Sequence, residues 1–178
     1  MNEQDMAFVL LGTGNAEYED FMRSAEWRHK GRLCAYIGYD EALSHRVYAG
    51  SDFLLMPSSF EPCGLSQMIA MRYGTLPIVR ETGGLRDSVQ PYNQFNGEGT
   101  GFSFANFNAY ELADTIRRAL ALYHNDHDAY CRVQRQAMSQ DFSFTRSAED
   151  YAHLYLLLLP EDTCLLYTSP SPRDVEES

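Results

Sequence analysis

Positive charge is scarce in this chain. Of its 178 residues, 14 are Lys or Arg and 25 are Asp or Glu, so the formal net charge is −11 at pH 7. A general nucleic-acid-binding protein needs an excess of basic side chains to neutralise phosphates. The composition therefore argues against a nucleic-acid partner, although a few local basic residues can still contact a diphosphate.

Long apolar runs and closely spaced cysteines are also missing. No apolar segment approaches the ~18 residues of a membrane-spanning helix, and no leader of the signal-peptide type opens the chain. The cysteines are Cys34, Cys63, Cys131 and Cys164, and they form no C-x-x-C pair that would indicate a metal or redox site. We therefore expect a reduced, soluble, cytoplasmic protein with no membrane partner.

What is present is an alternation of strand-like and helical segments. Apolar runs predict strands at residues 7–11, 33–37, 53–56 and 76–79, and helical spacing predicts helices at residues 16–29, 41–49 and 65–73, then a helical turn from Leu85. This alternation favours an α/β fold with a doubly wound, Rossmann-like parallel sheet. The chain is long enough for one such domain with its own core.

The second half of the chain predicts a loop followed by helices. Residues 90–101 have the Gly, Asn and Pro density of an exposed loop, and residues 102–104 are a candidate extended segment. Helices are expected near residues 109–123, 126–138 and 145–159. Asn108 is a candidate N-cap, and Glu111 three residues later completes a capping-box pattern.

The segment from Pro57 to Gln67 is the most informative part of the sequence. It joins a strand-like run to a helical one, so it lies at the carboxyl end of a strand, where open α/β sheets bind ligands. A helix N-terminus there suits a phosphate, and the carboxylate of Glu61 can accept hydrogen bonds from sugar hydroxyls. The segment therefore predicts half of a nucleotide-sugar site. The alternative is that Glu61 only caps the helix and interacts with its dipole.

Several blocks of the sequence, in one order, resemble bacterial glycogen synthase and plant starch synthase. They are residues 38–46 (GYDEALSHR), 57–67 (PSSFEPCGLSQ), 73–80 (YGTLPIVR), 82–87 (TGGLRD), 134–138 (QRQAM) and 141–144 (DFSF). The resemblance covers roughly residues 7–159. It implies a retaining α-glucan synthase of the GT-B type that uses ADP-glucose, with this chain as its carboxyl-terminal half.

The resemblance also implies roles for individual residues. Glu61 would be the catalytic residue that binds the glucose of the donor, and Tyr39 would stack on the nucleobase. The rest of the donor pocket would be lined by Cys63, Gly64, Leu65, Ser66, Thr82, Gly83 and Gly84. The family uses no metal and no other cofactor, and its α-1,4-glucan acceptor would bind through an amino-terminal domain that is missing here. Its members lie in the cytoplasm, or in the plastid of a plant.

One position departs from the wider GT-B pattern. Many retaining GT-B enzymes carry a second glutamate eight positions after Glu61, and this chain has Ile69 there. Glycogen synthases commonly lack this glutamate as well, so the change favours that subgroup. Two other functions stay open: a retaining GT-B glycosyltransferase with another nucleotide-sugar donor, and a non-catalytic nucleotide-binding module.

Some candidate residues have a second interpretation. Tyr39 could be an ordinary core tyrosine. Cys63 suggests a nucleophile, but a small residue that lines the pocket is the better account. His124 and His127 could suggest a metal pair, although nothing nearby completes a ligand set. The turn at residues 12–14 (GTG) lacks the third glycine of a dinucleotide fingerprint, so we assign it to tight packing.

The sequence also predicts where the domain ends. We expect residues 1–159 to form one nucleotide-sugar-binding domain, a fragment of a two-domain enzyme that is inactive alone. Residues 160–178 lack apolar periodicity and are rich in Ser, Thr, Pro and acidic residues. This segment resembles translated sequencing-adapter sequence, so we expect a disordered, non-native tail that should be excluded from the fold.

Overall fold

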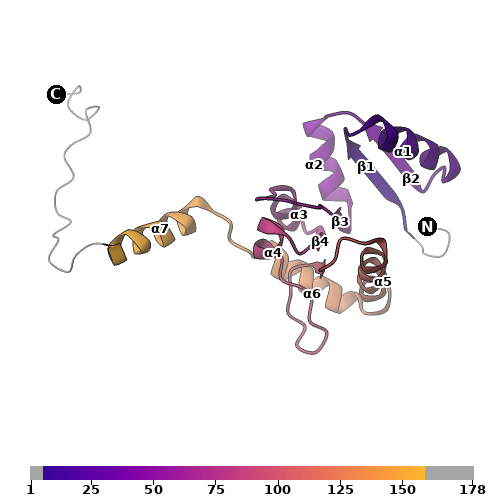
Figure 1. The fold of residues 1–178 in the computed structure, drawn as a ribbon. Helices are drawn as coiled ribbons and strands as arrows, with labels where there is room; N and C mark the ends of the chain where they lie inside the picture. The colour runs from indigo at the N-terminus through magenta and orange to yellow at the C-terminus, as the bar shows by residue number, and fades with distance from the viewer. Residues whose placement is uncertain (1–5, 159–178) are drawn as a thin grey trace, which may run out of the picture. The chain divides into compact units, whose positions relative to one another are not determined.

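The computed structural model describes residues 6–158 (Figure 1). Its contacts divide the chain into two units, Met1–Gln140 and Asp141–Ser178. The first unit holds an alternating series of strands and helices, and the described part of the second holds one helix. The expected tail at residues 160–178 lies outside the described residues.

The elements follow the order that the sequence predicts. The strands are β1 (Phe8–Gly12), β2 (Leu33–Ile37), β3 (Phe53–Met56), β4 (Leu76–Arg80) and β5 (Phe102–Phe104). The helices are α1 (Ala16–Arg28), α2 (Glu41–Gly50), α3 (Ser66–Tyr73), α4 (Gly83–Ser88), α5 (Ala109–Asn125), α6 (His127–Met138) and α7 (Phe144–Leu158). The predicted strands at 33–37 and 53–56 and the extended segment at 102–104 are confirmed at both ends. The other predicted elements differ by one or two residues at one or both ends, except that the helix end predicted at residue 159 lies outside the described residues.

All paired strands of the described residues run parallel, which confirms the α/β class. Hydrogen bonds divide them into two ladders, β1-β2 and β3-β4-β5. In the first ladder Phe8 lies opposite Leu33. In the second, Met56 at the end of β3 lies opposite Val79 near the end of β4. The carboxyl ends of β3 and β4 therefore share one edge.

The core of the first unit surrounds β4. This strand pairs on both sides, and α3, α5 and α6 contact it, so its run from Leu76 to Val79 is entirely buried. A strand covered in this way needs a continuous apolar run rather than an alternating one. The core residues are Met71, Leu76, Ile78, Val79, Leu85, Val89, Phe102, Ala119, Tyr130, Val133 and Ala137.

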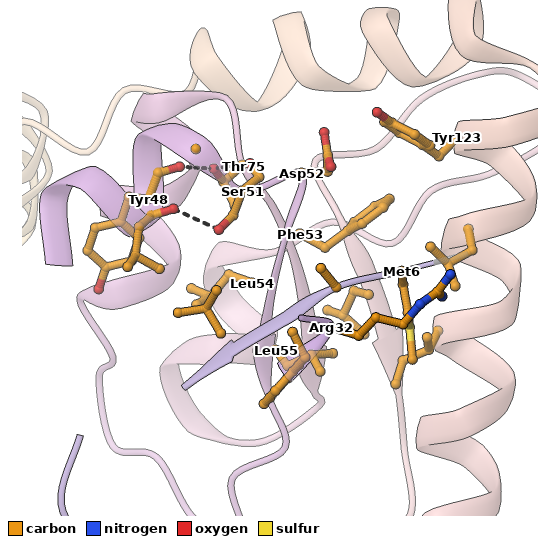
Figure 2. Close-up of a pocket in the computed structure, with 18 of the residues that line it drawn as sticks. Met6, Arg32, Tyr48, Ser51, Asp52, Phe53, Leu54, Leu55, Thr75 and Tyr123 are labelled. Carbon is orange, nitrogen blue, oxygen red and sulfur yellow. Dashed lines mark hydrogen bonds between the residues drawn. The ribbon is translucent and has the colours of Figure 1, made fainter. Parts of the chain in front are cut away.

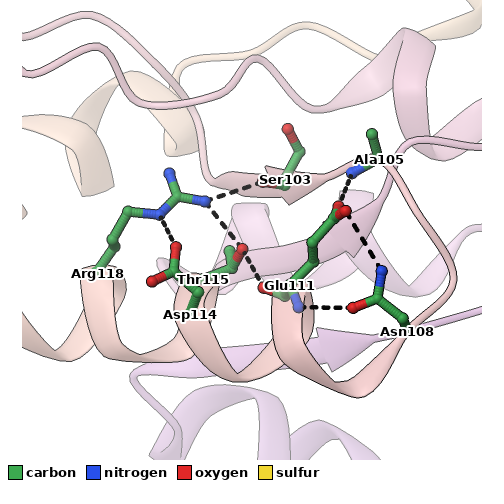
Figure 3. Close-up of polar contacts among 7 residues, drawn as sticks. All are labelled: Ser103, Ala105, Asn108, Glu111, Asp114, Thr115 and Arg118. Atoms are coloured by element: carbon green, nitrogen blue, oxygen red, sulfur yellow. Dashed lines mark hydrogen bonds and ion pairs between the residues drawn. The ribbon is translucent and has the colours of Figure 1, made fainter.

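Local signals set two of the helix ends. Gly74 stops α3 in the left-handed conformation, with φ of 83°, and its N–H donates to carbonyls of the last turn. The side chain of Asn108 accepts from the N–H of Glu111 at 2.9 Å, which confirms the predicted N-cap of α5. The carboxylate of Glu111 does not complete the capping box, because it accepts instead from the backbone N–H of Ala105 (Figure 3) and from that of Asn106.

The prediction that residues 12–14 pack tightly is wrong. A Cβ atom added to Gly12 or Gly14 would meet nothing within 4 Å. The N–H of Gly14 instead donates to the carboxylate of Glu19 at 2.9 Å.

Helix α7 exposes most of its apolar side chains. They include Phe144, Tyr151, Leu154, Tyr155 and Leu158, each at least half exposed.

Candidate functional site

The candidate site is built from two loops that follow neighbouring strands. The first loop, residues 57–65, joins β3 to α3, and the second loop, residues 81–84, leads from β4 into α4. Since β3 and β4 pair in parallel, both loops leave the same edge of the ladder. This edge is where open α/β sheets bind ligands.

The two loops touch backbone to backbone. The N–H of Gly84 donates to the carbonyl of Glu61 at 3.2 Å. A Cβ atom on Gly83 would overlap the carbonyl oxygen of Glu61, and one on Gly84 would overlap the carbonyl oxygen of Cys63. Gly83 also has a left-handed φ of 45°. Only glycine lets the loops approach this closely, so these two residues set the shape of the site.

Arg80, the last residue of β4, holds the first loop from the other side. Its Nη1 donates to the carbonyl of Ser59 at 2.6 Å and to that of Ser58 at 3.3 Å. Its Nε donates to the carbonyl of Ala105 at 3.3 Å, and its guanidinium carbon lies 5.7 Å from the ring centroid of Phe107. One side chain thus joins the first loop to the segment after β5.

A polar network fixes that segment in turn (Figure 3). The carboxylate of Glu111 accepts from the backbone and side-chain amides of Asn106, and these bonds lower the pKa of this carboxyl group. Arg118 pairs with Asp114 at 3.2 Å and donates to the carbonyl of Ser103 at 3.4 Å. The end of β5 is therefore anchored to the first turns of α5.

The carboxylate of Glu61 is available to a ligand. Its residue is half-buried in the first loop, and its side chain has no hydrogen bond or ion pair with any residue in the range 6–158. The N-cap position of α3 is Leu65 rather than Glu61. The alternative that Glu61 caps this helix is therefore wrong.

The remaining residues of the first loop present backbone rather than side-chain groups. Cys63 and Leu65 are exposed, while Gly64 and Ser66 are half-buried. Neither Leu65 nor Thr82, the N-cap residues of α3 and α4, makes a side-chain capping bond. Within the part of the chain that the structure describes, the first N–H groups of α3 thus have no side-chain cap, and such groups attract anions.

Tyr39 does not follow a strand of the ladder that carries the two loops. It follows β2, a strand of the other ladder, and is 86% exposed. The alternative of a core tyrosine is therefore wrong. The structure brings Glu61 and Cys63 against Gly83 and Gly84 and leaves Tyr39 at the end of a separate ladder.

His124 and His127 belong to an aromatic cluster. Both rings meet the ring of Tyr123 edge-on at 5.2 Å between centroids, and His127 stacks on Tyr130 at 5.4 Å. Among residues 6–158 no group of three metal-ligating side chains comes together. Both histidines are exposed, and their ring contacts are with tyrosines.

A cavity of about 670 Å³ lies elsewhere in the first unit (Figure 2). It is lined by residues of β1 and β3 and by Asp52, Thr75 and Tyr123, but not by Glu61 or the glycines of the site. The negative charge of Asp52 raises the pKa of Tyr123. β1 and β3 are each the edge strand of their own ladder, and both line this cavity. The cavity therefore lies at the break between the two ladders and is not the predicted site.

Sequence reasoning missed three residues that shape the site. Arg80, Gln67 and Ser88 all bond to the backbone of the two loops. A signal for Gln67 was present, because it shares the buried helical spacing of Ala70 and Met71 and is the polar member of that face. A polar side chain at a core position indicates a specific partner.

Comparison with known proteins identifies the relatives of this chain. A sequence family described as "Glycosyl transferases group 1" matches residues 1–136. A glycogen synthase of Exiguobacterium sibiricum is 54% identical over 158 residues, which cover 89% of this chain and 32% of that protein. A glycogen synthase of Desulfitobacterium hafniense is 50% identical over 151 residues, with 85% and 32% covered.

Solved structures agree with this result. The catalytic domain of starch synthase IV from Arabidopsis thaliana, bound to ADP and acarbose, superimposes with a TM-score of 0.76 at 39% identity and covers 85% of this chain and 32% of its own. Sucrose-phosphate synthase from Thermosynechococcus elongatus shares the fold, with a TM-score of 0.59 at 24% identity and 85% and 38% covered. The chain thus spans about a third of the length of the curated relatives. None of the helices within residues 6–158 is long and apolar enough to cross a membrane.

Proposed function

Since the chain belongs to the group 1 glycosyl transferases, we propose that it is the donor-binding part of a glycogen synthase. The proposed reaction transfers glucose from ADP-glucose to the non-reducing end of an α-1,4-glucan, with retention at the anomeric carbon. The observation that carries this proposal is the interlocked pair of loops beside the carboxylate of Glu61, which has no partner among the described residues.

Each part of the two loops has a proposed role. The carboxylate of Glu61 accepts hydrogen bonds from the hydroxyl groups of the glucose. The backbone N–H groups of residues 63–66 and 83–84 donate to the oxygens of the diphosphate. Because these groups are held in place before the donor binds, they stabilise the charge that develops on the leaving diphosphate without rearrangement. Tyr39 offers an aromatic face to adenine.

The choice of ADP rests on the solved relative. The starch synthase that is 39% identical to this chain was solved bound to ADP. Stacking on Tyr39 alone would not select adenine, because every base has an aromatic face. The donor nucleotide is therefore the part of the proposal that most needs a direct test.

The chain supplies one wall of the proposed reaction site. It spans about a third of its curated relatives, and we propose that the rest of the enzyme holds the glucan and supplies further cations for the diphosphate. Positioning two reactants accounts for a large part of an enzyme's rate. The isolated chain is therefore proposed to be inactive.

Rebuilding the enzyme tests this proposal. The chain is fused to the missing amino-terminal part of the Exiguobacterium sibiricum glycogen synthase, and labelled glucose incorporated into glycogen is measured with ADP-glucose or UDP-glucose. We expect incorporation from ADP-glucose by the rebuilt enzyme and none by the isolated chain. A preference for UDP-glucose would contradict the proposal that ADP-glucose is the donor. ADP binding without turnover would indicate a non-catalytic nucleotide-binding module. Incorporation by the isolated chain would contradict the proposal that the rest of the enzyme is needed for the reaction.

A further inference from the structure

A buried glutamine lies directly beneath the two loops. Gln67, in the first turn of α3, has no exposed surface. Its Nε2 donates to the carbonyl of Gly64 at 2.7 Å and to the hydroxyl of Ser88 at 3.0 Å, with a longer contact of 3.3 Å to the carbonyl of Cys63. The hydroxyl of Ser88 in turn donates to the carbonyl of Gly84 at 2.6 Å.

These bonds form one continuous connection between the loops. It runs from Gly64 in the first loop through the side chains of Gln67 and Ser88 to Gly84 in the second. The direct backbone bond from Gly84 to Glu61 is longer, at 3.2 Å. The side chains of Gln67 and Ser88 therefore supply the shorter bonds that hold the loops at a fixed separation.

The orientation of the Gln67 amide follows from its neighbours. Two carbonyl oxygens face Nε2, so exchanging the nitrogen and oxygen would place three acceptors against one another. In this orientation Oε1 is buried and has no hydrogen-bond partner among the described residues. A Cβ atom on Gly64 would lie 2.6 Å from this oxygen, so the glycine packs directly on the amide.

We propose that Gln67, acting through Ser88, is a positioning residue for donor binding. It sets the register of the backbone N–H groups of the first loop against those of the second, so that both sets meet one diphosphate. This role rests on the proposed function of the two loops. An unpaired buried acceptor is unfavourable for stability, and a side chain kept at that cost is explained by the geometry that its amide imposes.

A second glutamine provides a matched control. Gln134 also donates through Nε2 to a glycine carbonyl, that of Gly74, at the same distance of 2.7 Å. Gly74 ends α3, whereas Gly64 precedes it, so the two bonds lie at opposite ends of one helix. Loss of the Gln134 bond removes a similar contact without touching the loops.

The test compares Gln67→Met and Gln134→Met in the rebuilt enzyme and in the 178-residue chain. In the rebuilt enzyme we expect Gln67→Met to raise the Kd for ADP and the KM for ADP-glucose by about tenfold or more, because small misplacements at a site have large effects. Gln134→Met should change both by less than about twofold, even if its Tm falls as far. Ser88→Ala should give an intermediate loss, because the bond from Gln67 to Gly64 remains.

A charged substitution adds a readout that simple loss of packing would not produce. In Gln67→Glu a carboxylate faces the carbonyls of Gly64 and Cys63, and the repulsion should weaken ADP binding more than Gln67→Met does at neutral pH. Lowering the pH protonates this carboxyl group and restores one donor. The Kd of this variant relative to wild type should therefore fall as the pH falls, while that of Gln67→Met should not.

Amide hydrogen exchange of the 178-residue chain tests the register without any activity. We expect the N–H of Gly84 to exchange faster in Gln67→Met than in Gln134→Met or wild type, because it donates across the two loops. Equal exchange and equal ADP affinity in the two methionine variants would overturn the inference. If the rebuilt wild-type enzyme failed to bind ADP, the proposed function would be wrong, and the exchange rates would still decide whether Gln67 holds the loops together.

Discussion

At the scale of single residues, the site depends on two glycines whose absent side chains leave room for another backbone. Gly84 has no left-handed φ, so its need for glycine comes from the carbonyl of Cys63 alone. Gly83 combines a left-handed φ with a close approach to Glu61. A single methyl group at either position must push the loops apart.

Gly84→Ala should therefore damage the site. We expect a loss of about 1–3 kcal/mol in the free energy of unfolding, typical of overpacking, and a clear loss of ADP affinity. Gly14→Ala is the matched control, because its Cβ atom would meet nothing within 4 Å and its φ is not left-handed. Denaturant melts and calorimetric titration of ADP would measure both effects. Wild-type ADP affinity in Gly84→Ala would show that the close approach of the loops is not needed.

Glu61 should affect turnover more than nucleotide binding. Its carboxylate has no partner among the described residues, and we propose that it contacts the sugar. In the rebuilt enzyme, Glu61→Ala should lower kcat by about a hundredfold or more while the Kd for ADP changes by less than about threefold. Steady-state kinetics and ADP titration on the same preparation would compare the two. Equal losses in both would instead assign Glu61 to the support of the loop.

At the scale of elements, the start of α5 supports the site from a distance. Its N-cap bond from Asn108 and the carboxylate of Glu111 order residues 105–108, and Arg80 contacts Ala105 within that segment. A helix cap and a loop are thus stabilised by the same two side chains. Removing either side chain should lower the stability of the first unit.

Asn108→Ala should destabilise the first unit by about 1 kcal/mol, the usual effect of removing an N-cap. Asn125→Ala is a suitable control, because it ends the same helix and its side chain makes no hydrogen bond within the described residues. A shift in the midpoint of denaturation for Asn108→Ala but not for Asn125→Ala is expected. Equal midpoints would indicate that the helix end does not need this cap.

Glu111 should make stability depend on acid pH. Hydrogen bonds from Asn106 lower the pKa of its carboxyl group in the folded chain. The folded state therefore holds this proton less tightly than the unfolded state. The stabilisation is complete above the ordinary glutamate pKa of about 4.3 and is lost as the pH falls through the lowered value. In Glu111→Gln this part of the acid dependence should vanish, and melts from neutral to acid pH would show an unchanged profile if Glu111 has no such role.

At the scale of the whole molecule, the first unit has a complete core around β4, whereas α7 leaves its apolar side chains exposed. The chain also spans only about a third of its curated relatives. This short span agrees with a piece of a larger enzyme. We predict that residues 160–178 add nothing to the stability of the folded chain.

Deleting residues 160–178 should leave the free energy of unfolding unchanged. Their sequence has no apolar periodicity, and ordering a residue costs about 1 kcal/mol or more that must be offset by burial. Paired denaturant melts of the full and shortened chains would measure the difference. A clear fall in the midpoint on truncation would show that the segment packs on the folded chain.

Local sequence signals are sufficient to predict the order, type and approximate ends of the elements. Apolar runs located the strands, Gly74 marked the end of α3, and Asn108 marked the start of α5. These signals are local, because a strand or a helix end is specified by residues within a few positions of one another. The resemblance through residues 57–67 and 82–87 likewise used only the chain order.

How these elements meet depends on contacts between residues that are distant in the sequence. The approach of Gly84 to Cys63 and the connection from Gln67 to Ser88 each join residues about twenty positions apart, and the exposure of Tyr39 depends on where its ladder ends. No local pattern specifies such contacts, because they arise when parallel strands bring their carboxyl ends to one edge. The only sequence signal of such a backbone contact is a glycine, and a glycine alone does not identify the residue that it contacts.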